Sequence, residues 1–416
     1  MDRVRTAVIG TGGIFYGWGG GSGHLPGFGW VAEAQLAALC DPNENALNKA
    51  LAEARKFLNE KAKEAEDAND NERAQSLRDD AADLKGYTSL APLLDEAQPD
   101  LVVIISPAST HAPTSIAAMR AGANVICEKP MTRTWLEAQQ VVDVAAETGK
   151  FFHYGENLIY GDPWQVMRTC LDAGMIGETL MLYLPLAIGG MGNFSYARDK
   201  VGALLDMASH SITLSWYLIG FDKRPTRVKA VGPHGIAIRM PERQVAGVIA
   251  ELTVDDDAHL LVEYEDPKTG AWLNTHLEGS WSFRDSPETR VLGSTGALVP
   301  DGGGCKIIDS FGGERGCAPF HPSFHNMPQP PGWGGHPQQL KNMCHCILND
   351  IKPQCDENVG ADSMAIMGAA YLSQSRGRVA VSLDEFKAYA RDLEAKHGEN
   401  ASEVMIEEAL KGLARS

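Results

Sequence analysis

The chain has 416 residues, of which 44% are hydrophobic and 22% are charged. This composition is typical of a globular enzyme with two or three domains, and it excludes a disordered or fibrous chain. Acidic residues outnumber basic ones by 54 to 37, which gives a formal net charge of −17. We therefore expect no nucleic-acid or membrane partner, because both attract basic protein surfaces.

The sequence also carries no sign of secretion. No apolar run reaches the ~18 residues that a membrane crossing needs, and the first residues lack the apolar core of a signal peptide. Eight cysteines in a chain of this length do not indicate a disulfide framework. These features predict a reduced, cytoplasmic protein.

The first part of the chain alternates predicted strands and helices. Strands are expected at 4–9, 35–40, 100–105, 124–127 and 151–154. Helices are expected at 91–97, 114–121 and 134–148. This alternation predicts an α/β fold with a parallel sheet and crossover helices. The nearly continuous apolar strands indicate a sheet that is covered on both faces.

Gly10 and Gly12 follow the first predicted strand. In a dinucleotide-binding turn the first glycine permits the tight turn, and the second lets the pyrophosphate approach the backbone. The helix that follows presents free N–H groups to the phosphates. Phe15 stands where the third glycine of the usual pattern is expected. We predict a Rossmann NAD-binding domain over residues 1–155, with Gly10, Gly12, Gly13 and Ile14 as cofactor contacts.

Asp41 ends the second predicted strand. A carboxylate at this position can accept hydrogen bonds from both ribose hydroxyls of NAD, and it repels the 2′-phosphate of NADP. No basic residue follows it closely, so the sequence favours NAD as the cofactor over NADP. The alternative is a surface aspartate that precedes a proline turn.

Two insertions interrupt the expected pattern. Residues 15–23 contain five glycines together with Tyr16 and Trp18, and they delay the first helix until about residue 24. Residues 44–85 carry apolar side chains at three- and four-residue steps, with a break near residue 70, which predicts a helical hairpin. Packing of this hairpin against the sheet edge is favoured over a role as an oligomer contact or a lid.

Several motifs follow in order. Ser106, Pro107 and His111 come after the third predicted strand, and a Glu-Lys-Pro element at 128–130 comes after the fourth. Further along are Glu156-Asn157 and the segment 202–210, which contains Asp206 and His210. Together with the glycine turn, these motifs resemble the Gfo/Idh/MocA family of nicotinamide-dependent sugar and cyclitol oxidoreductases. The resemblance extends over about residues 1–380.

The resemblance implies particular roles for these residues. Lys129 and His210 are placed at the reacting carbon, with Asp206 in support. The implied cofactor contacts are Ser106, Pro107, His111, Glu128, Lys129 and Asn157.

The chemistry of these side chains agrees with the implied roles. Oxidation of a secondary alcohol needs a group that takes the hydroxyl proton, and histidine commonly does so near neutral pH. A lysine can stabilise the forming alkoxide. Asp206 and His210 lie four residues apart, on one face of a predicted helix. Whether Lys129 or His210 accepts the proton stays open. The structural alternatives are a salt-bridged loop lysine, a histidine at the core edge and a helix-capping aspartate.

The second part changes pattern. Strands are expected at 179–187, 226–231, 247–254, 259–264, 273–280 and 290–292, and helices at 209–219 and 338–348. This succession predicts an α+β domain with an open, mainly antiparallel sheet over residues 156–380. A long loop is expected at 301–335 and a helical tail at 381–416. In the family, one face of this sheet covers the cofactor, and the other often forms a subunit interface.

Substrate contacts are expected from side chains near the motifs. These candidates are Tyr160, Trp164, Arg198, His210 and His336. For Trp164, and also for Trp281, packing in the core is at least as favoured as stacking on a sugar. No metal site is expected from Cys344 and Cys346, because residues two apart on a helix point in nearly opposite directions.

The sequence therefore predicts an NAD-dependent oxidoreductase that acts on a secondary alcohol of a sugar, glycoside or cyclitol. The resemblance to this family also implies a homodimer or a homotetramer. Two alternatives remain open: a glycoside-cleaving enzyme that retains NAD and oxidises its substrate transiently, and a non-catalytic NAD-binding regulator.

Overall fold

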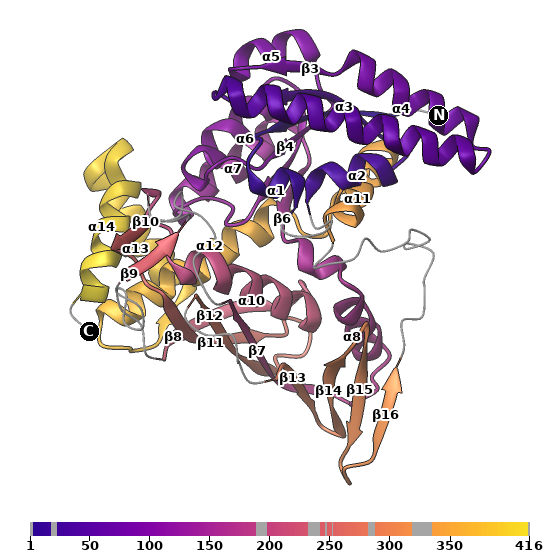
Figure 1. Ribbon diagram of the computed structural model, residues 1–416. Coiled ribbons are helices and arrows are strands. Elements are labelled where there is room, and N and C mark those ends of the chain that lie inside the picture. The colour runs from indigo at the N-terminus through magenta and orange to yellow at the C-terminus, as the bar shows by residue number, and fades with distance from the viewer. Residues whose placement is uncertain are drawn as a thin grey trace. The chain divides into compact units, whose positions relative to one another are not determined.

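The structure is a computed structural model that describes residues 3–17, 23–188, 198–231, 242–245, 248–251, 253–281, 288–317 and 335–414 (Figure 1). It divides into two compact units. The first comprises Met1–Glu128, Gln140–Gly161 and His321–Glu357, and the second comprises Lys129–Gln139, Asp162–Phe320 and Asn358–Ser416. These bounds differ from the expected domain boundaries after residues 155 and 380, because a late segment packs with the first unit.

The first unit is built on a six-stranded parallel sheet with the order β3-β2-β1-β4-β5-β6. Its strands are β1 (Val4–Ile9), β2 (Ala34–Cys40), β3 (Lys85–Tyr87), β4 (Leu101–Ile104), β5 (Asn124–Glu128) and β6 (Phe152–Gly155). This order confirms the predicted Rossmann-like α/β fold. The short edge strand β3 was not predicted, because its three residues are exposed or half-buried and carry no apolar pattern.

The helices of this unit follow the strands in alternation. They are α1 (Gly13–Tyr16), α2 (His24–Trp30), α3 (Glu44–Asp67), α4 (Asn71–Asp83), α5 (Leu90–Ala97), α6 (His111–Arg120), the second half of α7 (Trp135–Thr148) and α11 (His336–Asn349). Two short 3₁₀ turns accompany them, η1 (Ala108–Thr110) and η2 (Asn157–Tyr160). α11 packs against α2 and η2, which is why a late segment belongs to this unit.

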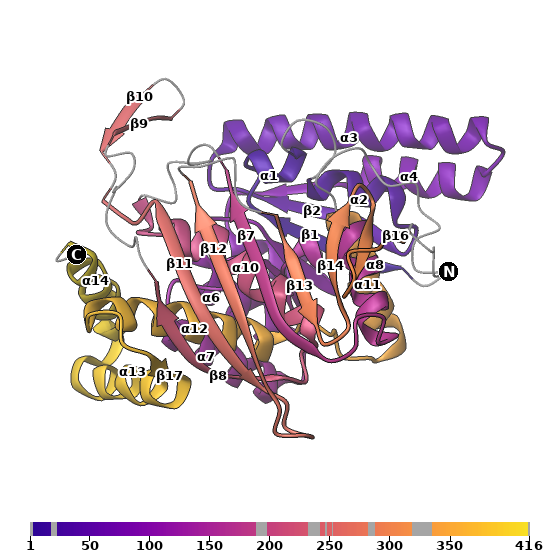
Figure 2. The ribbon, with the colours of Figure 1, turned by 90° about the horizontal axis from the view of Figure 1, so that it is seen from below.

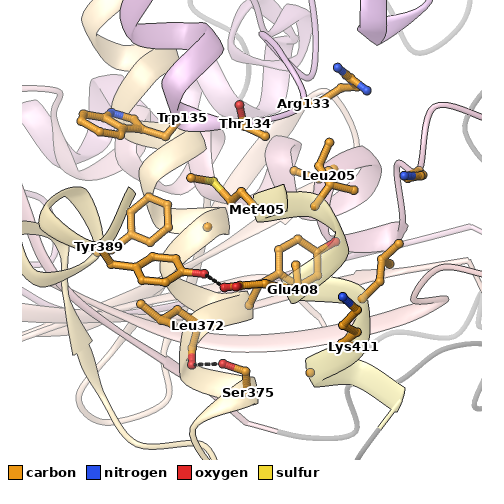
Figure 3. A pocket seen from close by; sticks show the side chains of 18 of the residues that line it. Arg133, Thr134, Trp135, Leu205, Leu372, Ser375, Tyr389, Met405, Glu408 and Lys411 are labelled. Carbon is orange, nitrogen blue, oxygen red and sulfur yellow. Dashed lines mark hydrogen bonds between the residues drawn. The ribbon is translucent and has the colours of Figure 1, made fainter. Parts of the chain in front are cut away.

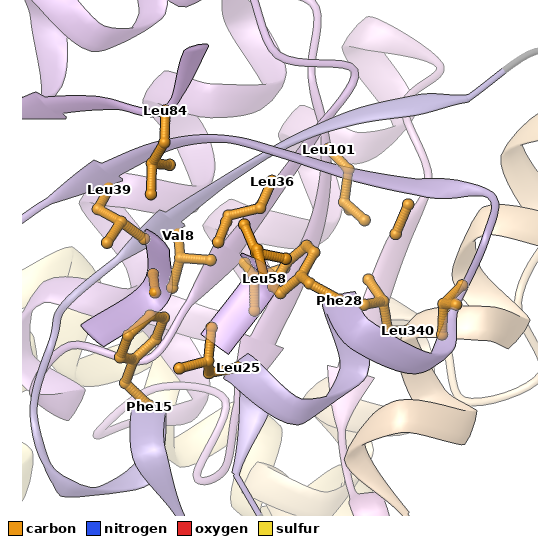
Figure 4. Packing of buried hydrophobic residues seen from close by; sticks show 14 of the residues in the cluster. Val8, Phe15, Leu25, Phe28, Leu36, Leu39, Leu58, Leu84, Leu101 and Leu340 are labelled. Carbon is orange, nitrogen blue, oxygen red and sulfur yellow. The ribbon is translucent and has the colours of Figure 1, made fainter. Parts of the chain in front are cut away.

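The core of the first unit explains the missing third glycine. Phe15 is fully buried and shares one hydrophobic cluster with Val8, Leu25 and Leu340 (Figure 4). A side chain at this position therefore fills the core. The expected interruption of the first helix is confirmed, since α1 ends at Tyr16 and α2 begins at His24. Trp18 lies outside the described residues.

The predicted helical hairpin is confirmed as α3 and α4. Asn43 caps α3 by accepting hydrogen bonds from two backbone N–H groups, and Asp70 caps α4 in the same way with one. Asn69 adopts the left-handed conformation between the helices, with φ 64°. The hairpin packs against β2, β3 and α2, so it covers the edge of the sheet, as the favoured interpretation expects.

The second unit contains a nine-stranded sheet with the order β16-β15-β14-β13-β7-β12-β11-β8-β17. Its strands are β7 (Thr179–Ala187), β8 (Arg224–Ala230), β11 (Asp257–Glu265), β12 (Trp272–Ser280), β13 (Arg290–Gly293), β14 (Gly296–Asp301), β15 (Gly304–Asp309), β16 (Glu314–Cys317) and β17 (Val381–Ser382). β9 (Glu242–Val245) and β10 (Val248–Glu251) form a separate hairpin. Only β7 and β12 pair in parallel among the described strands of the nine-stranded sheet, so the mainly antiparallel prediction is confirmed.

Helices accompany this sheet. They are α8 (Asp162–Asp172), α10 (Ala203–Ile219), α12 (Glu357–Ser375), α13 (Leu383–His397) and α14 (Ala401–Ala414), with the turn η4 (Gly398–Asn400). α10 lies across β7, β12 and β11 (Figure 2). The expected helical tail corresponds to α13 and α14, which pack against each other. Within the described residues no helix has both the length and the apolar character that a membrane crossing needs.

Two local predictions for this unit were wrong. α10 begins six residues before the predicted start, because the Asp255 carboxylate accepts a hydrogen bond from the Leu204 N–H at 2.7 Å and caps the helix from a distant segment. The expected long loop contains β15 and β16. The glycines there make the tight turn of a hairpin, with φ 83° at Gly312, so a high glycine content does not mean an irregular loop. Residues 318–334 lie outside the described part.

Candidate active site

The turn after β1 runs close to the end of β4. Gly10 has φ 96°, and a Cβ there would lie 2.9 Å from the backbone nitrogen of Ser106. A Cβ at Gly12 would meet no atom within 4 Å, so this backbone borders open space. α1 begins at Gly13. The N–H groups of Gly13 and Ile14 lie at its start, and the Phe15 N–H donates to the Gly12 carbonyl at 3.1 Å. The turn thus offers the space and the N–H donors that a pyrophosphate requires.

Asp41 follows β2 directly and is held beside this turn. Its Oδ2 accepts hydrogen bonds from the Thr11 backbone N–H at 2.9 Å and from the Thr11 hydroxyl at 2.8 Å. Its Oδ1 accepts one from the Asn43 N–H at 2.9 Å. The carboxylate is therefore fixed at the carboxyl end of the parallel strands, where open α/β sheets bind nucleotides.

The loop after β4 contains three of the predicted cofactor contacts. Ser106 Oγ lies 2.6 Å from the Thr110 hydroxyl, and Pro107 comes directly before η1. The ring of His111 is buried, and its Nε2 lies 2.8 Å from the Ser106 carbonyl oxygen. His111 therefore braces the loop, while Ser106 and Pro107 are half-buried.

Lys129 pairs with a buried carboxylate in the second unit. Its Nζ lies 2.5 Å from Asp206 Oδ1, and Trp281 Nε1 donates to Asp206 Oδ2 at 2.7 Å. Asp206 and Trp281 are buried, whereas the Lys129 side chain is 12% exposed. Burial alone would raise the pKa of Asp206, but the Lys129 ammonium and the Trp281 N–H bring this pKa below its ordinary value. Asp206 is therefore ionised at neutral pH and fixes the Lys129 ammonium.

His210 lies one helical turn after Asp206 on α10. Every other residue of α10 is buried, and His210 alone in this helix is partly exposed. An electrostatic interaction with His210 is among the causes that lower the pKa of Asp206, so the two side chains are close enough to interact. α10 thus presents one imidazole on the turn that follows the Asp206–Lys129 pair.

Glu128 is the last residue of β5 and is buried in the first unit. Its Oε1 lies 2.8 Å from His24 Nε2 and 3.1 Å from His336 Nε2. Burial alone would raise the pKa of Glu128, but these two hydrogen bonds hold it well below its ordinary value. Burial also lowers the pKa of His24. The trio is therefore an ionised carboxylate between two buried imidazoles, which joins β5 to the starts of α2 and α11.

The remaining predicted contacts are dispersed. Asn157 is buried in η2. The Tyr160 hydroxyl lies 2.6 Å from His153 Nε2 and donates to Asn342 at 3.1 Å, so it takes part in a hydrogen-bond network of the first unit. In the second unit Trp164 is half-buried on α8. The Arg198 side chain is 65% exposed and pairs with Asp199 at 3.1 Å.

A cavity of about 440 Å³ lies elsewhere in the second unit (Figure 3). It is lined by residues of α12, α13 and α14, by residues 133–135, and by Lys200 and Leu205, and the Tyr389 hydroxyl donates to Glu408 at its wall. Neither Lys129, Asp206 nor His210 lines it. The cluster of Lys129, Asp206 and Trp281 therefore does not form part of the cavity wall, although Leu205, the residue before Asp206, does.

Sequence reasoning missed two partners of the predicted residues. Trp281 was expected to serve either the core or a sugar, and the structure buries it with its N–H on Asp206. A buried tryptophan N–H needs a partner, but the sequence does not say which one. No sequence pattern indicated that His24 is the partner of Glu128. His24 follows the glycine-rich insertion, and it contacts a residue 104 positions away.

Two family models match the chain. The model described as "Oxidoreductase family, NAD-binding Rossmann fold" matches residues 4–156, and the model "GFO/IDH/MocA C-terminal domain" matches residues 164–299. Together they cover more than half of the chain.

Individual proteins resemble the chain at low identity. scyllo-Inositol 2-dehydrogenase (NAD(+)) of Bacillus subtilis is 22% identical over 71% of this chain and 81% of its own length. A glycosyl hydrolase family 109 protein of Shewanella baltica is 31% identical over 43% of this chain and 34% of its own length. The first curated relatives are matched over about half of their length.

Solved structures share the fold. A levoglucosan dehydrogenase in complex with NADH and levoglucosan superposes with a TM-score of 0.71 at 17% identity. The match covers 92% of this chain and 100% of that one. At this identity the likeness shows the fold alone, but it extends over both units. With the two family models, these findings establish that the chain belongs to the Gfo/Idh/MocA family of NAD-binding oxidoreductases.

Proposed function

We propose that this protein catalyses NAD-dependent hydride transfer at a secondary alcohol of a sugar, glycoside or cyclitol, or at the corresponding ketone. The observation that carries the proposal is the Lys129–Asp206–Trp281 cluster, with His210 partly exposed one helical turn away. A cation fixed by a buried carboxylate, next to an imidazole, suits the redox chemistry of alcohols. The family assignment supplies the nicotinamide, which takes the hydride from the substrate carbon.

Each residue of the cluster has a separate proposed role. Lys129 is held as an ammonium by Asp206, so it stabilises the negative charge that develops on the substrate oxygen. His210 takes the hydroxyl proton, since imidazole is the usual proton acceptor near neutral pH. Asp206 and Trp281 act through Lys129 and keep it in position. This assignment chooses between the two proton acceptors that the sequence left open.

The first unit would hold the cofactor. Gly10, Gly12 and Gly13 form the turn for the pyrophosphate, and Asp41 would accept hydrogen bonds from the adenosine ribose hydroxyls. A carboxylate at this position favours NAD over NADP. Ser106, Pro107, His111 and Asn157 remain proposed cofactor contacts, as does Glu128.

The substrate class rests on the relatives' chemistry. Related proteins include an NAD-dependent inositol dehydrogenase and a levoglucosan dehydrogenase. The glycosyl hydrolase relative supports a second candidate, in which the same oxidation is transient and leads to cleavage of a glycoside with NAD retained. Both candidates use the same first step. Tyr160, Trp164, Arg198 and His336 stay candidate substrate contacts.

We also propose a cytoplasmic homodimer or homotetramer. All eight cysteines lie in the described part of the chain, and none forms a disulfide, which suits a reducing compartment. Light scattering of the purified protein tests the oligomeric state.

One assay tests the proposed function. The purified protein is first analysed for retained nicotinamide, and then sugars, glycosides and inositols are supplied with NAD or NADP while nicotinamide absorbance and products are recorded. Reduction of NAD with one substrate group supports the dehydrogenase. Cleaved glycoside with retained NAD and no net reduction supports the second candidate. Cofactor binding with no change in any substrate would contradict both and favour a regulator.

A further inference from the structure

Three cysteines that the proposed function does not use converge in the second unit. Cys170 belongs to α8, Cys305 to β15 and Cys317 to β16, so they come from distant parts of the chain. Their sulfur atoms all lie within 4.8 Å of one another. Cys170 and Cys305 are buried, and Cys317 is half-buried.

The fold itself brings the three thiols together. Cys305 and Cys317 are directly opposite in the antiparallel pair β15–β16, so their side chains point to the same face of the sheet. α8 packs against β14 and β15 and supplies Cys170. The cluster therefore lies where this helix meets the edge of the nine-stranded sheet.

The separation of two of the sulfurs is informative. Cys170 Sγ lies 3.8 Å from Cys305 Sγ, which is far longer than the roughly 2.05 Å of a disulfide bond. Two thiolates on one tetrahedral zinc ion, each with a zinc–sulfur bond of about 2.3 Å, are about 3.8 Å apart. We propose that Cys170, Cys305 and Cys317 bind a zinc ion that fastens β16 and α8 together.

The position of β16 explains what such an ion would contribute. β16 is the outermost strand of the sheet and has only four residues, of which Glu314, Arg315 and Gly316 are exposed. It therefore buries little apolar surface of its own. Phe311 in the preceding turn is 99% exposed and adds no packing. Three zinc–thiolate bonds would attach β16 to the rest of the unit, which its few buried side chains do only weakly.

The charges balance in a simple way. Binding of Zn²⁺ to three thiols releases three protons and leaves a site with one net negative charge. The fourth tetrahedral position is left to water or to another ligand. Zinc undergoes no redox change, and the role proposed for it here is to hold β16 and α8 together.

A reactive thiol at this cluster, or a metal site at Glu128 instead, fits the contacts less well. Cys170 and Cys305 are buried, so an oxidant or an electrophile has little access to their sulfur atoms. The trio of Glu128, His24 and His336 has comparable ligand chemistry, but its contacts are ordinary hydrogen bonds and need no ion.

The test measures metal content and is independent of any activity. The whole protein is produced with zinc in the medium, gel-filtered and analysed for metal per chain. Wild type is compared with Cys170→Ser, Cys305→Ser and Cys317→Ser, and with Cys346→Ser, which removes another buried thiol. We expect one zinc per chain in wild type and in Cys346→Ser, and loss of zinc in each of the three cluster variants. Circular dichroism checks that Cys317→Ser, the mildest change, is folded.

Cobalt gives a second readout. Replacement of zinc by Co²⁺ should produce thiolate-to-metal charge-transfer bands in wild type, and these bands should be missing in folded Cys317→Ser. Three results would overturn the proposal: folded wild type without zinc or cobalt–thiolate bands, a Cys170–Cys305 disulfide found by mass spectrometry, or zinc that is lost with His336→Ala and kept in the cysteine variants.

Discussion

Trp281 offers the sharpest test of the cluster around Lys129, because it is absent from the motifs and touches no proposed reactant. The substitution Trp281→Phe keeps an aromatic ring in the buried site but removes the N–H that Asp206 Oδ2 accepts at 2.7 Å. A hydrogen bond to an ionised group contributes about 1.5–3 kcal/mol, and the smaller ring leaves a void that costs about 1 kcal/mol more. We therefore expect the free energy of unfolding to fall by about 2.5–4 kcal/mol.

The same change should alter the position of Lys129. If the hydrogen bond acts by orienting Asp206, its energy corresponds to a loss of roughly 10- to 100-fold in kcat. KM should change less, because Trp281 contacts the carboxylate and no substrate. The folded-state pKa of Asp206 is lowered, so the stability of the ion pair is present above its unfolded pKa and is lost as the pH falls through the folded value. Losing the N–H raises this pKa, so the stability that the ion pair contributes should be lost at a higher pH in Trp281→Phe than in wild type.

Urea unfolding over a range of pH gives the pH profile of stability, and kcat at neutral pH gives the effect on Lys129. Trp272→Phe is the matched control, since Trp272 is 55% exposed on β12 of the same unit. Wild-type stability and an unshifted profile in Trp281→Phe would refute the assigned role. A loss of stability with an unchanged pH profile would show that Trp281 only fills the core.

Three further predictions concern the ribose contact, the two residues at the reacting carbon and a buried carboxylate. Asp41→Ala should lower the affinity for NAD by about tenfold or more and the affinity for NADP by less, which calorimetric titration would measure. Equal losses of affinity for the two cofactors would exclude the ribose contact. Lys129→Ala and His210→Ala should each lower kcat by about 10²–10⁴-fold with cofactor affinity nearly unchanged, whereas a normal rate in either variant would remove that residue from the mechanism. Burial raises the pKa of Asp255 to about 6, so wild type should lose about 3 kcal/mol of stability relative to Asp255→Asn as the pH rises from about 3 to 7. Parallel urea stabilities of the two proteins over this range would contradict that burial cost.

Periodicity and glycine placement predicted most of the first unit. Apolar strands and amphipathic helices are local patterns, so β1, β2 and the hairpin of α3 and α4 were predicted within a residue or two. Gly10 is also a local signal, because its φ of 96° is a property of the turn itself. The fold class and the glycine turn could therefore be recognised from local sequence patterns.

Features that depend on distant partners could not be predicted. α10 starts early because Asp255, some fifty residues later, caps it. Glu128 contacts His24 and His336, which lie more than one hundred residues before and after it in the sequence. Trp281 reaches Asp206 in the same way. In each case tertiary packing determines the partner, and the spacing of residues along the sequence does not indicate it.

The central claim is hydride transfer to nicotinamide at the Lys129 cluster, and isotope transfer tests it most directly. Sugars, glycosides and inositols with deuterium on their ring carbons are mixed with excess protein and NAD, and the nicotinamide is then analysed by mass spectrometry. In reactions quenched during the first turnover, deuterium should appear in the nicotinamide with at least one substrate group, and His210→Ala should abolish it. Early quenching is needed because a transient oxidation later returns the label to the product. Nicotinamide that stays bound and free of deuterium with every substrate group would contradict the account.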